Sequence, residues 1–147
     1  MMKTLYVTDL DGTLMRDDKI ISKESVTILN RLLSQGIFLT YATARSLDSA
    51  SKITRNISFH LPVIIRNGTI LADPQSKREI EIAMFGEELR HIRQALADTA
   101  IPGFATAYFG AKEVKLCLAG RTNEGFQDYL QNHSTDRSIH MVDTEDK

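Results

Sequence analysis

The sequence has little that would crosslink it or carry it into a membrane. It contains one cysteine in 147 residues, so no intramolecular disulfide can form, and a reducing cytoplasm is the simplest expectation. No apolar run approaches a membrane span, which takes about 20 residues. The N-terminus also lacks the apolar segment of a signal peptide. We therefore expect a cytoplasmic protein with no membrane partner.

An excess of charge of either sign is also lacking. Lysine and arginine number 18 against 19 aspartate and glutamate residues, which gives a formal net charge of −1. Such a balance indicates no basic surface for nucleic acid or for anionic lipid. The composition is 42% hydrophobic and 25% charged, which is ordinary for a globular protein and excludes disordered, collagen-like and low-complexity chains. We expect no nucleic-acid partner.

The first half of the sequence alternates short apolar segments with amphipathic ones. Residues 4–8, 37–42 and 63–65 have the composition of buried strands. Between them, Ser22 can cap a helix that runs to about residue 35, where Gly36 follows, and Ser46 can cap another to about residue 55. Alternating strands and helices predict an α/β fold with a parallel sheet. Ligands of such sheets bind beyond the carboxyl ends of the strands.

The pattern changes near residue 70. Residues 69–72 and 78–82 predict a hairpin, followed by a helix over 87–100, strands over 104–109 and 113–118, a helix over 123–132 and a strand over 138–142. This half is expected to be α+β and antiparallel, with Cys117 buried and inert in its strand. Three parallel strands make a thin sheet, and the sequence stops directly after the last predicted strand. We therefore expect an incomplete fold.

The clearest chemical signal is the segment D-L-D-G-T at residues 9–13, directly after the first predicted strand. Two carboxylates at positions i and i+2 on a turn can converge on one site. The structural alternative is an Asx-rich turn, which aspartate followed by glycine favours by itself. A calcium loop of the EF-hand type would need glycine and glutamate where Leu14 and Ile20 stand, and a helix before it, so that alternative is excluded.

Residues 9–13 resemble the nucleophile motif of the haloacid dehalogenase-like (HAD) superfamily, in which phosphatases dominate. Residues 41–46, Y-A-T-A-R-S, end the second predicted strand and are similar to its second motif, a threonine or serine that closes that strand. Residues 66–69, R-N-G-T, resemble the Asn-Gly turn of the Cof-like branch, although Ala44 and Thr69 stand where that branch often has glycine and alanine. The branch inserts a large α/β cap domain at this point. The resemblance implies a partial Rossmann-like core over 1–69 and part of a cap domain over 70–147.

The resemblance also implies a reaction. Asp9 would be the nucleophile that forms a covalent aspartyl-phosphate, and Asp11 would protonate the leaving oxygen and then deprotonate the attacking water. The cofactor would be Mg²⁺, ligated by the Asp9 carboxylate and the Asp11 backbone carbonyl. The substrates would be small phosphorylated metabolites of the sugar-phosphate type.

Further residues follow from the same motifs. The amides of Leu10 and Ala44 and the hydroxyl of Thr43 would bind the phosphate, with Ala44 at a helix N-terminus. Gly12 leaves room for a close backbone approach, and it is assigned to substrate binding together with Arg45 and Asn67. Structural alternatives stay open for three of these positions. Thr43 could simply cap a helix, Arg45 could cover the sheet edge, and Asn67 could only make a turn.

Two family motifs are missing from the sequence, a lysine after the cap domain and an acidic G-D-x-x-N-D segment. Lys112 and Lys115 fall in the cap region by order, so neither is assigned the lysine's role. Without these groups we expect a weak or inactive phosphatase. The alternative is a non-catalytic remnant or phosphate-binding protein, and a phosphotransferase or mutase is a third interpretation. An incomplete sheet also leaves an apolar edge through which the chain could self-associate.

Overall fold

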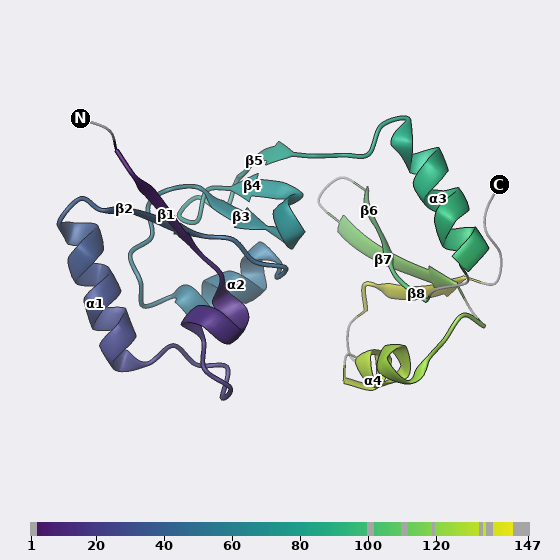
Figure 1. Ribbon diagram of the computed structural model, residues 1–147, viewed down its shortest axis with the longest axis horizontal. Coiled ribbons are helices and arrows are strands. Elements are labelled where there is room, and N and C mark those ends of the chain that lie inside the picture. Colours follow the sequence, from purple (N-terminus) through teal and green to yellow (C-terminus); the bar gives the residue numbers. More distant parts are fainter. Residues whose placement is uncertain are drawn as a thin grey trace. The chain divides into compact units, whose positions relative to one another are not determined.

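A computed structural model describes residues 3–99, 102–109, 112–118, 120–132, 134 and 137–142. The chain forms two compact units, Met1–Met84 and Phe85–Lys147, and each is described by itself (Figure 1). The mixed α/β architecture agrees with the predicted fold class. Within the described residues, no helix has the length and apolar character that crossing a bilayer requires.

The first unit begins with two parallel strands joined by a helix. Strand β1 (Leu5–Thr8) pairs with β2 (Phe38–Tyr41) in a register that puts Leu5 beside Phe38. Helix α1 (Lys23–Ser34) lies between them in the chain, and the Ser22 side chain accepts a hydrogen bond from the Ser25 amide at its start. Gly36, with a φ of 81°, follows its end. The left-handed region suits glycine, so both predicted helix boundaries are confirmed.

The third predicted strand leads into an antiparallel sheet. Helix α2 (Leu47–Thr54), capped by Ser46 as predicted, precedes β3 (Val63–Ile65). Strand β3 is joined to the end of β2 by an isolated parallel bridge between Ala42, the residue directly after β2, and Ile64. Its regular partner is β4 (Ile70–Ala72), which pairs in turn with β5 (Glu79–Ile82).

The hairpin of β4 and β5 is confirmed, but it extends the sheet of β3. By contacts it belongs with the first unit, whose boundary falls after Met84. The predicted division into a core over 1–69 and a cap domain over 70–147 concerns family domains and stays a prediction.

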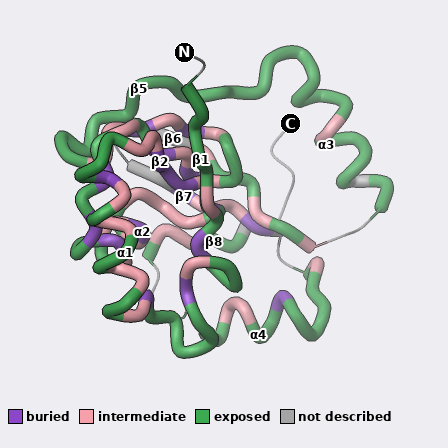
Figure 2. Tube along the Cα trace, turned by 60° about the vertical axis from the view of Figure 1, so that its left-hand side comes forward, coloured by how far each residue is buried: buried purple, intermediate pink, exposed green. Residues whose placement is uncertain are grey.

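The burial of β1 differs from expectation. Leu5 and Tyr6 are each 55% exposed and Val7 is 49% exposed, so the prediction of a buried strand is wrong (Figure 2). The reason is its position in the sheet. Among the described strands β1 pairs with β2 alone and is therefore an edge, where an apolar sequence does not secure burial.

The core of the first unit is formed by β2, β3 and β4 together with residues of both helices and the segment after α2. Tyr41 is fully buried and packs edge-on against Phe59, with 5.1 Å between ring centroids. Burial raises the pKa of the Tyr41 hydroxyl. The other buried hydrophobic residues of the first unit are Leu10, Met15, Ile21, Leu33, Leu39, Ala50, Ile57, Val63, Ile65, Ile70 and Ala72.

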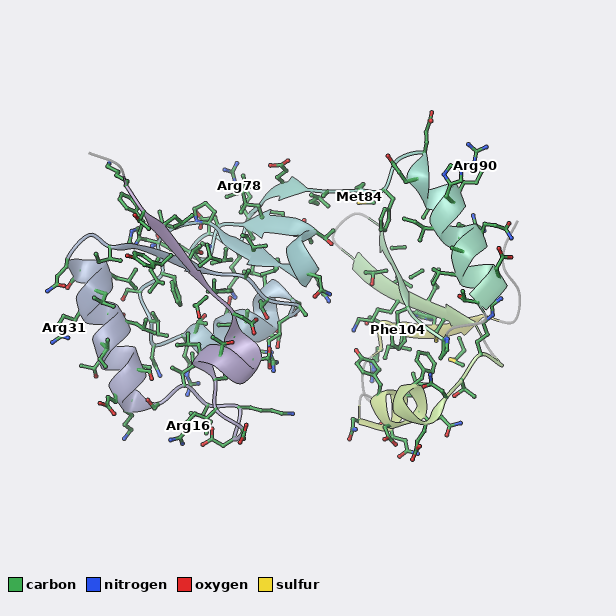
Figure 3. The ribbon with its side chains drawn as sticks, viewed as in Figure 1. Arg16, Arg31, Arg78, Met84, Arg90 and Phe104 are labelled. Carbon is green, nitrogen blue, oxygen red and sulfur yellow. The ribbon has the colours of Figure 1, made fainter. Side chains whose placement is uncertain are left out.

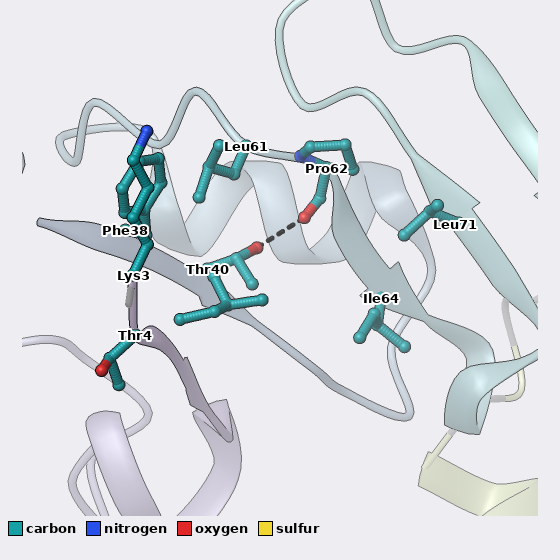
Figure 4. Close-up of a pocket in the computed structure, with 9 residues that line it drawn as sticks. Lys3, Thr4, Phe38, Thr40, Leu61, Pro62, Ile64 and Leu71 are labelled. Atoms are coloured by element: carbon teal, nitrogen blue, oxygen red, sulfur yellow. Dashed lines mark hydrogen bonds between the residues drawn. The ribbon is translucent and has the colours of Figure 1, made fainter. Parts of the chain in front are cut away.

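An apolar groove of about 420 Å³ lies along β1, β2 and β3 (Figure 4). The Lys3 ammonium lies 5.2 Å from the centre of the Phe38 ring at one side of it, a cation–π distance. The remaining lining residues are Thr4, Leu5, Thr40, Leu61, Pro62, Ile64 and Leu71. None of the residues predicted to act on phosphate lines this groove.

The described residues of the second unit form two helices and a three-stranded sheet. Helix α3 (Glu88–Thr99) precedes β6 (Ala105–Phe109) and β7 (Lys112–Leu118), and α4 (Glu124–Asn132) precedes β8 (Ile139–Val142). Strands β6 and β7 are antiparallel as predicted. Strands β7 and β8 are parallel, so the prediction of a wholly antiparallel half is wrong. The physical reason is α4, since a helical crossover returns the chain to the end from which it started.

The packing of the second unit centres on one aromatic cluster. The Phe104 ring, labelled in Figure 3, lies 5.0 Å from Phe126 and 5.1 Å from Tyr129, measured between centroids. Cys117 on β7 is 3% exposed, as predicted, and burial raises the pKa of its thiol. A thiol in that setting stays protonated and unreactive.

Candidate active site

The two aspartates lie in a turn held in place by a buried leucine. Leu10 is fully buried, and its carbonyl oxygen accepts a 2.8 Å hydrogen bond from the Met15 amide. Asp9, Asp11 and Gly12 around it are exposed. Gly12 has a φ of +74°, in the left-handed region that glycine adopts without strain. The loop is therefore anchored at Leu10 and displays both carboxyl groups at the carboxyl end of β1.

Asp9 has a weak local contact. The Thr13 hydroxyl donates to its Oδ2 atom over 3.5 Å, at the long limit of hydrogen bonding. Such a bond orients the carboxylate without tying it firmly. An exposed, loosely held carboxylate is compatible with nucleophilic attack, the role predicted for Asp9.

Asp11 is held much more firmly, by Arg45 at the carboxyl end of the neighbouring strand. Arg45 Nε donates to Asp11 Oδ2 over 2.8 Å and Nη2 donates to Oδ1 over 2.6 Å, a two-pronged ion pair. The hydrogen bonds from Arg45 lower the pKa of the Asp11 carboxyl, partial burial opposes that effect, and the positive charge of Arg45 adds to the lowering. The same contact raises the pKa of Arg45. Asp11 is therefore an ionised, oriented carboxylate in this structure.

This ion pair was not predicted from the sequence, although a signal for it exists. β1 and β2 are adjacent parallel strands, so the loops after them share one edge of the sheet. Arg45 lies two residues after Thr43, in the second of these loops. Of the alternatives left open for Arg45, substrate contact or cover for the sheet edge, neither included a direct bond to Asp11.

Thr43 lies at the centre of the hydrogen bonds that join the loops. Its side chain is 4% exposed, and its hydroxyl oxygen accepts a 3.2 Å bond from the Arg45 amide. A hydroxyl that accepts one bond can still donate its own hydrogen, which is what the predicted phosphate contact needs. Ala44 is the next residue and is exposed. It lies two residues before Ser46, which caps the start of α2.

The turn after β3 is tied to the same place. The Asn67 amide donates to the Thr43 carbonyl oxygen over 3.2 Å, and the Arg66 amide donates to that of Arg45 over 3.1 Å. Arg66 and Asn67 have φ values of 54° and 56°, a conformation that costs about 1 kcal/mol or more in residues with a Cβ atom. These bonds offset that strain and bring Asn67 next to the loop after β2.

The donors predicted for Mg²⁺ fit that ion in type. The Asp9 carboxylate and the Asp11 carbonyl are hard oxygen ligands, and the Asp11 carboxylate is already taken by Arg45. In the described part of the chain, however, no group of three or more histidine, cysteine, aspartate or glutamate side chains could hold a metal ion. Lys112 and Lys115 lie on β7 in the second unit, as their order in the sequence predicted.

Sequence comparisons show a protein family and curated proteins to which the chain is similar. The family model described as haloacid dehalogenase-like hydrolase matches residues 6–147. A 5-amino-6-(5-phospho-D-ribitylamino)uracil phosphatase from Bacillus subtilis is 34% identical over 71 residues, 48% of this chain and 26% of the relative. A phosphoglycolate phosphatase from Methanopyrus kandleri is 29% identical over 99 residues, 65% of this chain and 43% of the relative.

Solved structures share the fold. A phosphatase of the haloalkanoate (HAD) enzyme superfamily from Bacteroides thetaiotaomicron aligns with a TM-score of 0.68 at 18% identity. The alignment covers 97% of this chain and 50% of that protein. The chain thus spans about half the length of this structural relative and less than half of the two curated relatives above.

Proposed function

Since the chain belongs to the haloacid dehalogenase-like hydrolases, we propose that it acts on small phosphorylated metabolites of the sugar-phosphate type, with Asp9 as nucleophile and Mg²⁺ as cofactor. The observation that carries the proposal is the placement of Asp9 and Asp11 on one anchored turn beside Thr43. Two relatives named as phosphatases of small phosphorylated compounds support the substrate class.

The first half of the reaction forms a covalent intermediate. A carboxylate oxygen of Asp9 bonds to phosphorus while the bond from phosphorus to the leaving oxygen breaks. Asp11, which is ionised in the free chain, first takes up a proton from solvent. It then gives that proton to the leaving oxygen, and the product alcohol departs. Mg²⁺, when bound, neutralises charge between the carboxylate and the phosphoryl group.

The second half regenerates the site. Asp11, now a carboxylate, takes a proton from water as the water oxygen attacks the phosphorus of the aspartyl-phosphate. The bond between the Asp9 oxygen and phosphorus breaks, and inorganic phosphate leaves. Asp11 returns this proton to solvent when its ion pair with Arg45 forms again, so one proton is taken up and one released in each turnover.

The remaining site residues bind and orient. We assign the amides of Leu10 and Ala44 and the hydroxyl of Thr43 to the phosphoryl oxygens, because backbone donors at a helix start suit anions. Gly12, Arg45 and Asn67 are assigned to the substrate side of the site. Their support is the set of bonds that joins the three loops, from Asp11 to Arg45 and from Asn67 to Thr43.

For the 147-residue chain by itself we propose weak turnover or none. The described residues supply two oxygen ligands to Mg²⁺ and no third acidic side chain beside them, so the ion would keep mostly water ligands. Charge stabilisation is usually the largest part of catalysis, and it would be deficient here. The shortage of acidic ligands for Mg²⁺ among the described residues favours a second candidate function. In that function the chain binds phosphate without hydrolysing phosphate esters.

The experiment incubates the purified chain with Mg²⁺ and a sugar phosphate, then measures phosphate release and phosphorylation of Asp9 by mass spectrometry. Wild-type chain should carry phosphate on Asp9, and Asp9→Asn should carry none. Asp18→Asn makes the same change of charge in an exposed loop outside the site and should behave as wild type. Phosphate binding without phosphorylated Asp9 would support the second candidate, and no binding at all would contradict both.

A further inference from the structure

We propose that the Asp11 carboxylate and the phosphoryl group of the substrate compete for the same arginine, Arg45. This inference rests on the proposed function. In the free protein Arg45 holds Asp11, and in the complex it turns to the phosphate and leaves Asp11 to face the leaving oxygen. Arg45 is then a residue with two partners, and the arrival of the phosphate releases Asp11.

The first support is the geometry of the ion pair. Both Asp11 oxygens accept from Arg45, over 2.6 and 2.8 Å. The Arg45 guanidinium faces both oxygens of Asp11 and so occupies the side of the carboxyl group that the leaving oxygen of the substrate would have to approach. An acid that must contact a leaving oxygen cannot keep that pairing, so the contact has to open during the reaction.

The second support is the fit of the arginine to either partner. The planar guanidinium can pair with either a carboxylate or a phosphate, because each offers two oxygens to its parallel N–H groups. A phosphate monoester carries more negative charge than a carboxylate and therefore attracts Arg45 more strongly. Arg45 also follows directly after Thr43 and Ala44, the segment assigned to the phosphate, and its amide is bonded to the Thr43 hydroxyl.

The third support is the small cost of opening the pair. The Asp11 side chain is 49% exposed and the Arg45 side chain is 27% exposed. Water competes for ion pairs at such positions, and their net stabilisation is small. Arg45 Nη1 is also bonded to the Ser49 hydroxyl over 3.2 Å, so the arginine keeps one anchor on α2 when it leaves Asp11.

The test measures the dissociation constant of inorganic phosphate by calorimetry, in Mg²⁺ buffer, for wild type, Asp11→Ala, Arg45→Ala and the double variant. Removing the competitor in Asp11→Ala should tighten phosphate binding about fivefold, the size expected of a partly exposed ion pair. In the Arg45→Ala background the same change should alter binding by less than about twofold. Asp18→Ala, which leaves the exposed Arg16 without its partner, is the matched control and should bind as wild type.

The outcomes separate this inference from the proposed function. An equal gain in both backgrounds would mean that Asp11 only repels the anion, and it would overturn the competition. So would an Arg45→Ala variant that binds phosphate as tightly as wild type. If no variant binds phosphate, the proposed function fails as well.

A second measurement needs no variant and so does not depend on the folding of Arg45→Ala. Phosphate added to the wild-type chain should shift the NMR signal of the Arg45 Nε–H group, which now points at Asp11, and leave that of Arg16 in place. An unmoved Arg45 signal at saturating phosphate would overturn the inference. Arg16 is labelled in Figure 3.

Discussion

The hydroxyl of Thr40 on β2 donates a 2.6 Å hydrogen bond to the carbonyl oxygen of Pro62, at the entry to β3. Thr40 is 3% exposed, and the bond spans 22 residues of sequence. Since β2 and β3 share one regular bridge, this side-chain bond is a main link between the strands that carry the second and third site loops.

We therefore expect Thr40→Val to destabilise the chain by about 1 kcal/mol, because valine keeps the shape but leaves the Pro62 carbonyl without its donor. Urea unfolding followed by circular dichroism measures the change. Thr27→Val removes a hydroxyl that bonds the Lys23 carbonyl on the exposed side of α1, and it should change stability much less. Equal losses for the two variants would contradict the role given to Thr40.

The two helix-capping serines should each contribute to stability. Ser22 accepts from the Ser25 amide over 3.0 Å, and Ser46 accepts from the Ser49 amide over 3.3 Å. Replacing either by alanine should cost about 1 kcal/mol, with a larger loss for the shorter bond. Thermal unfolding of the two variants tests this. Ser34→Ala, at the other end of α1, is the control and should stay near wild type.

Asp73 should make stability depend on pH. Its Oδ1 accepts from the Ser76 amide over 2.6 Å and from the Gln75 amide over 2.9 Å, and these bonds lower its pKa from the ordinary value of 3.8. A lowered pKa in the folded state means that the stabilisation is complete above the ordinary value and disappears as the pH falls through the lowered one. Asp73→Ala should therefore be less stable than wild type at neutral pH, and the gap should shrink below about pH 4. A gap that stays constant across this range in urea unfolding would refute the prediction.

The exposed edge strand should drive self-association. Leu5, Tyr6 and Val7 are each about half exposed, on a strand that pairs on one side alone among the described strands. Unpaired backbone donors and acceptors beside apolar side chains favour pairing with a second strand. We expect the mass measured by light scattering to rise with concentration, and Tyr6→Lys to suppress that rise. Ile28→Lys adds the same charge at a 42% exposed position on α1, and it should leave association unchanged.

Local sequence signals were enough for most helices and strands and for the turn that carries Asp9 and Asp11. Ser22, Ser46 and Gly36 act through hydrogen bonds and backbone preferences within a few residues, so their helix boundaries follow from the sequence alone. The motif at residues 9–13 likewise needs only its neighbours to form a turn. Its position after β1 follows from the same local pattern.

Other features depend on partners far away in the chain. The sequence of β1 is that of a buried strand, yet burial depends on which strands flank it. In the part of the chain that the structure describes, β2 flanks it on one side alone. The direction of β8 depended on the crossover through α4, which periodicity does not reveal. Nor does the sequence pair Asp11 with Arg45, which are 34 residues apart.

The sequence by itself determined the helices, the strands and the residues that display carboxyl and hydroxyl groups at the ends of β1 and β2. Only the tertiary structure decided which of those groups meet. The physical reason is range, because caps, turns and periodicity act within a few residues, whereas the ion pair of Asp11 and Arg45 exists only once two parallel strands bring their loops together.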